Sequence, residues 1–156
     1  CFVSAFSRCT RDSANLASAS AARWATAANS LLDLMFGANK AASFPNTYYL
    51  ALFLDTPAPT ITGGTEPSGN GYARVAVGND GTNFAAASNR VKTTATNITF
   101  PTPTGAWGTV AYVGIYSAST GGTFYGYGAL SGPIYVDTGV TVAILSGGFD
   151  ITIPSV

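Results

Sequence analysis

The chain has 156 residues, of which only 9% are charged, 47% are hydrophobic and 18 are glycine. Seven basic and seven acidic residues cancel, so the protein has no net field to attract a nucleic-acid backbone or an anionic membrane surface. The length suits one domain with a buried core, and because no run of 18 apolar residues occurs, we expect neither a membrane span nor a nucleic-acid partner.

The N-terminal part of the chain favours a helix. Residues 13–36 are rich in alanine and contain no proline or glycine, and Gly37 follows where a helix would end. The helical period brings five side chains near one face: Leu16, Trp24, Ala28, Leu31 and Met35. We expect the apolar cluster of Leu31, Leu34 and Met35 to pack on the sheets, with docking on a partner as the alternative.

From Pro45 onwards the sequence favours β-strands separated by glycine- and proline-containing turns. Eight segments have strand character: 47–55, 72–77, 89–100, 108–118, 122–130, 133–137, 140–145 and 149–153. Short strands at this spacing, without helical patterns between them, predict an antiparallel β-sandwich, jelly-roll-like in character, or a barrel. We therefore divide the chain into an N-terminal extension and helix, 1–43, and a β-sandwich domain, 44–156.

The chain contains no histidine. Its absence excludes nucleophiles activated by histidine and metal sites built on histidine ligands. The seven acidic residues are dispersed, and none lies beside a second acid in an apolar strand, where a glycosidase pair would need it. Asp80 in GNDGTN matches a calcium-binding loop only weakly, and a type I′ turn at Asp80-Gly81 is the better interpretation. We expect no enzyme activity, no cofactor and no bound metal.

The segment GTEPSGNGYARVAV, residues 64–77, contains one of the few carboxylates and one of the few arginines of the chain. Gly69 and Gly71 permit a positive φ, which a tight turn requires. Arg74 can pair with Glu66 in the same loop or with an acid of a neighbouring subunit. A structural turn is the favoured interpretation, and a contact with another protein is the alternative.

Aromatic residues concentrate in two places that have strand or loop character. Tyr125 and Tyr127 alternate with glycine in FYGYG, so both are expected to project from one face of a strand, while Trp107 lies in the loop GAWG. Burial in the sheet core or at a subunit interface is the favoured interpretation of these rings. The alternative is a platform that stacks on sugars.

Six segments in chain order resemble a known family: LLDLMFG, YYLALF, TEPSGNGYARVAV, ITFPTPTGAWGTVAYVGIYSASTGG, YGAL and GGFDITI. Together they span about residues 29–153, and their succession is similar to that of small structural proteins from the virions of tailed bacteriophages. Members are often labelled tail-fibre proteins, and related small β-rich proteins decorate or cement phage heads. The resemblance implies a location in the virion, on the capsid surface or the tail. It also implies that Tyr72-Ala73-Arg74 belongs to the fold and has no catalytic role.

The resemblance, the short chain and the lack of a repeating fibre shaft favour a capsid decoration or cement protein that stabilises the head. Such a protein would act as an oligomer, such as a trimer, bound to the major capsid protein or to tail proteins. Residues 1–28 are the candidate clamp, and the expected interface residues are Trp24, Leu31, Met35, Glu66 and Arg74.

The alternative is a tail-fibre or tail-tip protein that binds a glycan of the host surface. The candidate stacking residues for this function are Trp107, Tyr125 and Tyr127. A third class, a secreted or lipid-anchored bacterial adhesion domain, rests only on the cysteine at position 1.

Overall fold

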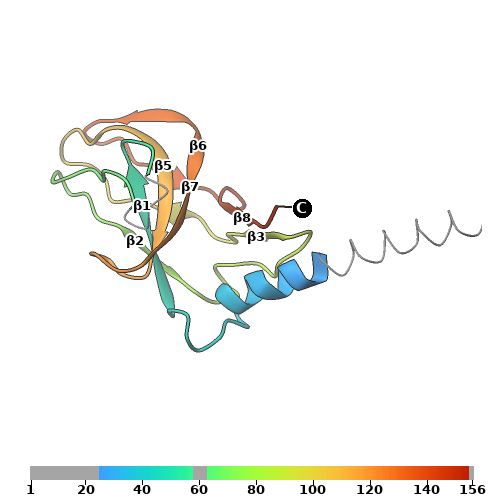
Figure 1. The fold of residues 1–156 in the computed structure, drawn as a ribbon. Coiled ribbons are helices and arrows are strands. Elements are labelled where there is room, and N and C mark those ends of the chain that lie inside the picture. The colour runs from blue at the N-terminus through green and yellow to red at the C-terminus, as the bar shows by residue number, and fades with distance from the viewer. Residues whose placement is uncertain (1–24, 58–62, 155–156) are drawn as a thin grey trace, which may run out of the picture.

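The structure, a computed structural model, describes residues 25–57 and 63–154 (Figure 1). Within this part of the chain a helix spans 25–35. The strands are β1 (Thr47–Phe53), β2 (Val75–Gly78), β3 (Val91–Thr93), β4 (Ile98–Thr99), β5 (Gly108–Tyr116), β6 (Phe124–Val136), β7 (Ala143–Ile144) and β8 (Asp150–Thr152). All paired strands are antiparallel, which confirms the predicted mainly β fold with an N-terminal helix.

Three sheets surround the main core. The largest has the strand order β2-β1-β5-β6, and the two small ones pair β3 with β8 and β4 with β7. Leu50 and Val113 of the large sheet are buried in one cluster with Ile98 of β4 and Ile144 of β7. Among the described residues no sheet closes on itself, so the arrangement is sandwich-like and the barrel alternative is wrong.

Strand β1 is apolar along its length because both of its faces are covered. Tyr48, Leu50 and Leu52 point into the main core, whereas Ala51 and Phe53 belong to a second buried cluster on the opposite face of the large sheet. Successive side chains of a strand alternate between faces. The continuous apolar sequence TYYLALF therefore fits a central strand that contributes to two clusters.

Most of the strands begin or end a few residues away from the predicted boundaries, and the strand pattern itself differs at two places. The expected strands 122–130 and 133–137 are one continuous strand, β6, because Val110 pairs with Ile134 and Tyr112 with Ala129, so a bulge absorbs the residues between them. The expected strand 89–100 is interrupted between β3 and β4. There the backbone N–H of Thr94 donates to the carbonyl of Phe149, a residue that precedes β8 and is not paired in a sheet.

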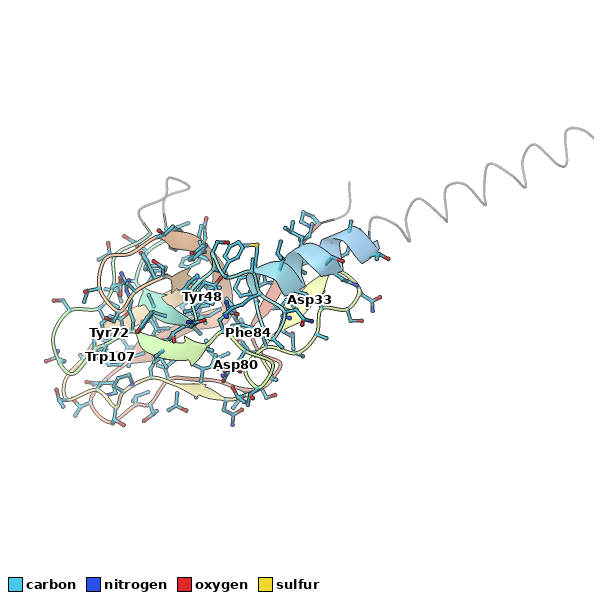
Figure 2. The ribbon with its side chains drawn as sticks, turned by 90° about the horizontal axis from the view of Figure 1, so that it is seen from below. Asp33, Tyr48, Tyr72, Asp80, Phe84 and Trp107 are labelled. Carbon is cyan, nitrogen blue, oxygen red and sulfur yellow. The ribbon has the colours of Figure 1, made fainter. Side chains whose placement is uncertain are left out.

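The turn at Asp80 is also different from the predicted one. A type I′ turn needs a positive φ at both central residues, and neither Asp80 nor Gly81 has one. Instead, the Asp80 carboxylate accepts hydrogen bonds from the backbone N–H groups of Thr82 and Asn83 at 2.9 and 3.0 Å. Asp80, labelled in Figure 2, thus caps a helical turn and is not part of a hairpin.

The helix packs through a different face from the one expected. Leu32 and Phe36 are buried, and the Phe36 ring lies 4.9 Å from the ring of Tyr48 between centroids. Leu31 and Leu34 are instead 50% and 46% exposed, so their predicted packing on the sheets is wrong. Gly37, with φ 95°, follows the helix as predicted.

Gly114 of β5 is expected to be essential for the second cluster. A Cβ at this position would lie 2.5 Å from a ring carbon of Phe53 and 2.9 Å from one of Phe124. Gly114→Ala should therefore lower the free energy of unfolding by about 1–3 kcal/mol through overpacking. Urea unfolding would measure the loss, and Gly128→Ala is the control because a Cβ at Gly128 meets nothing within 4 Å. Equal stability of the two variants would contradict the prediction.

Candidate functional site

Arg74 is the centre of a polar cluster between the 63–74 loop and the β5–β6 hairpin. Its Nε and Nη2 donate to the Glu66 carboxylate at 3.1 and 2.6 Å. Its Nη1 donates to the backbone carbonyls of Ala118 and Gly121 at 2.9 and 2.8 Å. The guanidinium also lies 3.5 Å from the ring centroid of Tyr116. One side chain therefore fastens the loop, the hairpin and an aromatic ring to one another.

The same cluster fixes the chain entering β2. The Tyr72 hydroxyl donates to Glu66 at 2.9 Å and accepts from the backbone N–H of Leu52 at 3.0 Å. Burial raises the pKa of Tyr72 above its ordinary value, so this hydroxyl stays protonated. Glu66 and Arg74, expected at an interface, pair within the loop of one chain, and this local pairing favours the structural turn.

The Gly-rich part of the loop has the predicted backbone. Gly69, Asn70 and Gly71 all have positive φ, at 71°, 50° and 76°. The Trp107 indole N–H donates to the carbonyl of Asn70 at 3.0 Å, and the Trp107 ring meets the Tyr72 ring edge-on at a centroid distance of 5.2 Å. The turn is therefore held by packing and hydrogen bonds of its own chain.

Trp107 is unsuited to stacking on a sugar. It is only 4% exposed, and Figure 2 shows it beside Tyr72, away from the helix that carries Asp33. Its ring and its N–H group are both engaged inside the protein. Trp107 is thus buried, as in the favoured interpretation of these rings, and the alternative of a sugar platform does not fit it because its N–H group is bound to the 69–71 turn.

A set of rings occupies the face of the large sheet that points away from the main core. We call it the aromatic face, and its members are Tyr49, Phe53, Tyr112, Tyr116, Phe124 and Tyr127. The register aligns Tyr49, Tyr116 and Phe124 across three strands. Such cross-strand neighbours lie close enough for aromatic contact.

Tyr125 and Tyr127 lie on opposite faces of the sheet. Tyr116 pairs with Phe124 and Ile115 with Gly126, so Tyr125 is the extra residue of a bulge. Its ring packs edge-on against Tyr48 of the main core at 5.3 Å. Tyr127 contacts Tyr112 at 6.0 Å on the aromatic face. The prediction that both tyrosines share one face is wrong, because a bulge reverses the alternation.

The aromatic face is covered at one side and open at the other. Arg74 lies over Tyr116, and Gly63 and Gly64 cross so close to Tyr116 and Phe53 that side chains at those glycines would collide with the rings. Tyr127 remains 42% exposed. The open side thus presents a ring with an apolar surface to solvent.

Two neighbours of Tyr127 complete this open side, and neither was singled out from the sequence. The Phe124 ring is nearly parallel to that of Tyr127, with an interplanar angle of 12° and a centroid distance of 6.3 Å. The Tyr112 hydroxyl accepts a hydrogen bond from Thr56 Oγ1 at 2.9 Å. The alternation of Tyr112, Gly114 and Tyr116 in the sequence was the available signal for Tyr112. The arrangement offers apolar rings with hydroxyl groups beside them.

The remaining expected interface residues lie on the helix. Trp24 lies outside the described residues. Leu31 is exposed, whereas Met35 is partly buried against the main core, and its backbone carbonyl accepts from the Tyr48 hydroxyl at 3.0 Å. The candidate clamp, residues 1–28, falls almost entirely outside the part that the structure describes.

The carboxylates and other potential metal ligands of residues 25–57 and 63–154 form no metal site. No group of three or more potential ligands among them is placed to hold a metal ion. Asp33, Asp55 and Asp80 are each engaged by hydrogen-bond donors of their own chain. Helices long and apolar enough to cross a bilayer are also absent from this part of the chain.

Comparison with known families identifies the kind of protein. The family described as Podophage GP4 fiber I protein gp80 matches residues 22–152. The chain belongs to this family. A search of curated proteins gave no match. The matched range includes every described strand and the whole described helix, so the fold presented above is the fold of a phage fibre family member.

Membership in a fibre family confirms the expected structural role and location in the virion, among other virion proteins. It supports the fibre alternative better than the capsid decoration that we favoured from the sequence. The resemblance to head decoration proteins rested on small size and β content, which many virion proteins share.

Proposed function

We propose that the protein is a structural part of a podophage tail fibre, that it works as an oligomer bound to other tail proteins, and that its aromatic face contacts a glycan on the host surface. The fibre-family match supports the tail role. The exposed ring of Tyr127, beside Phe124 and Tyr112, is the single observation that supports glycan binding.

The chemistry of the open side suits a sugar. The C–H face of a pyranose packs on an aromatic ring, and its hydroxyl groups need polar partners at the rim. Tyr127 and Phe124 supply nearly parallel rings, while the Tyr112 and Thr56 hydroxyls lie at the edge. Binding by stacking needs no ionised group, which agrees with the low charge of the chain.

Tyr127→Ala is expected to weaken glycan binding by at least about tenfold, because it removes the most exposed ring of the aromatic face. Binding of the full chain to a panel of bacterial surface glycans would measure the effect. Tyr135→Ala is the matched control, since Tyr135 lies on the same strand and is even more exposed but has no place in the aromatic face.

Three outcomes would count against the glycan role. They are the lack of any bound glycan, unchanged binding by Tyr127→Ala, and an equal loss in both variants. Urea unfolding of both variants checks that they fold. Substitutions at exposed positions usually change the free energy of unfolding by only about 0.5 kcal/mol, so a much larger loss would show that a variant is misfolded.

The tail role is tested separately by electron microscopy of particles labelled with an antibody to the β domain. Label on the tail supports a fibre component. Label repeated over the shell would instead support a function in capsid decoration.

A further inference from the structure

A carboxylate lies at the rim of the aromatic face, just beyond the end of β1. Asp55 follows Phe53 by two positions, and a Cβ at Gly64 would lie 2.7 Å from Asp55 Oδ1 and 3.2 Å from a ring carbon of Phe53, so the carboxylate and the ring are neighbours. Asp55 is exposed. The next residue, Thr56, donates to the Tyr112 hydroxyl at 2.9 Å. A carboxylate and two hydroxyl groups therefore share this rim.

Asp55 is held in place and can still accept hydrogen bonds from a ligand. Its Oδ2 accepts from the Thr65 hydroxyl at 2.6 Å, and its Oδ1 accepts from the Thr65 backbone N–H at 2.7 Å. These two hydrogen bonds hold the pKa of Asp55 below its ordinary value, so the group is ionised at neutral pH. A carboxylate can accept about four hydrogen bonds, so about half of this capacity is free for the hydroxyl groups of a sugar. Hydrogen bonds to an ionised acceptor are also stronger than those to a neutral one.

The rim has no free cation within the part of the chain that the structure describes. Arg74 is the basic residue of the aromatic face, and its guanidinium already donates to Glu66 and to the carbonyls of Ala118 and Gly121. A negatively charged group of a ligand would therefore meet the Asp55 carboxylate without a cation to neutralise it.

The other basic residues of the described chain lie near the helix, toward the start of β1. The helix contacts this end of β1, where the Tyr48 hydroxyl donates to the carbonyl of Met35 at 3.0 Å. Lys92 pairs with an aspartate of the helix at 2.7 Å, the backbone N–H of Arg90 donates to an asparagine of the helix, and Lys40 follows the helix in the sequence. These cations are thus at the other end of β1 from the rim.

We propose that Asp55 makes the aromatic face selective for glycans that carry hydroxyl groups and no negative charge. The inference rests on the glycan role proposed above and names the class of glycan. The rings of Tyr127 and Tyr112 are 6.0 Å apart between centroids, and Asp55 lies beyond Tyr112, so a ligand that contacts all three spans more than one sugar ring. Its hydroxyl groups donate to Asp55, whereas a uronic acid or a phosphorylated sugar places a like charge there. Like-charge repulsion is a general means of rejecting a ligand.

The test measures the affinity of the full chain for two forms of one glycan. They are the neutral glycan of the panel that binds most tightly and a derivative in which its primary alcohols are oxidised to carboxylates. The wild type should bind the neutral form about fivefold more tightly at low salt. The preference should shrink at high salt, because ions screen exposed charges. Asp55→Asn should bind the neutral form more weakly and lose most of the preference, because the amide keeps an acceptor but carries no charge.

Asp80→Asn is the matched control. It removes the same charge from another exposed carboxylate, which also accepts from backbone N–H groups, those of Thr82 and Asn83. Asp80 lies near the start of β1, since Gly78 pairs with Thr47. This variant should keep the affinity and the preference of the wild type, and circular dichroism verifies that both variants fold.

A preference that Asp55→Asn loses and Asp80→Asn keeps would establish the selectivity. Tighter binding of an acidic glycan by the wild type would overturn it, as would an equal preference in Asp55→Asn. In both cases the glycan role stands if Tyr127→Ala weakens binding, so only the selectivity fails. If no glycan binds, or if Tyr127→Ala binds as the wild type does, the glycan role itself fails and the selectivity fails with it.

Discussion

Arg74→Ala should lower the free energy of unfolding by about 3–5 kcal/mol. The substitution leaves the Glu66 carboxylate, which is largely buried, without its cation, and it removes the donors to the carbonyls of Ala118 and Gly121. The loop and the hairpin would then lose the side chain that joins them. A loss of this size is a large share of the stability of a typical domain, about 5–15 kcal/mol.

Urea unfolding of two further variants separates the contributions. Arg74→Lys should recover only part of the loss, because an ammonium cannot reach the carboxylate and both carbonyls at once. Glu66→Gln combined with Arg74→Met should cost less than Arg74→Ala alone, since no unpaired carboxylate remains. A loss below about 1 kcal/mol for Arg74→Ala, typical of an exposed ion pair, would show that the cluster is not a structural fastener.

The sequence alone predicted the elements that depend on local pattern. The apolar run of β1, the positive φ of Gly69 and Gly71 and the end of the helix near Gly37 all follow from side-chain type and backbone freedom. The Glu66–Arg74 pair was also foreseeable, because the two residues belong to one short loop.

The positions of the aromatic rings depend on strand register, which the sequence does not display. FYGYG places both tyrosines on one face only if the strand is regular. The bulge opposite Ile115 and Tyr116 moves Tyr125 to the main core and leaves Tyr127 on the other face. Trp107 has a similar explanation, since its burial depends on the 69–71 turn, far from it in the sequence.

The orientation of the helix was ambiguous because apolar residues surround its last turns. Leu31, Leu32, Leu34, Met35 and Phe36 allow more than one packing face. The docked face is marked by polar contacts that are distant in sequence. Asn29 Oδ1 accepts from the backbone N–H of Arg90 at 2.7 Å, and Asp33 Oδ1 accepts from that of Ala87 at 2.9 Å. These contacts leave Leu31 and Leu34 facing outward.

The pair between Asp33 and Lys92 should respond asymmetrically to substitution. Lys92 is 2% exposed and Asp33 is 29% exposed at the side chain. Asp33→Ala leaves the buried ammonium of Lys92 without its carboxylate and removes the acceptor for the backbone N–H of Ala87. It should therefore lower the free energy of unfolding by about 3–5 kcal/mol. Lys92→Met keeps the buried volume and leaves the Asp33 carboxylate, which reaches water. It should therefore lower the free energy of unfolding by only about 1 kcal/mol. Urea unfolding at neutral pH compares the two, and equal or reversed costs would contradict this account.

The pH dependence of stability gives an independent view of the same pair. Burial alone would raise the pKa of Asp33, but the hydrogen bonds from Lys92 and from the backbone of Ala87 outweigh it and hold the pKa below 3.8. The folded protein therefore binds this proton less tightly than the unfolded chain. The stabilisation is complete above 3.8 and is lost as the pH falls through the lower folded value. In Asp33→Ala, the loss of stability in acid that comes from Asp33 should be absent. A weaker dependence of stability on pH should remain, because hydrogen bonds from Thr65 and Asn83 also lower the pKa values of Asp55 and Asp80. Unfolding midpoints that decline in acid as steeply in Asp33→Ala as in the wild type would show that the helix is not held by this charge.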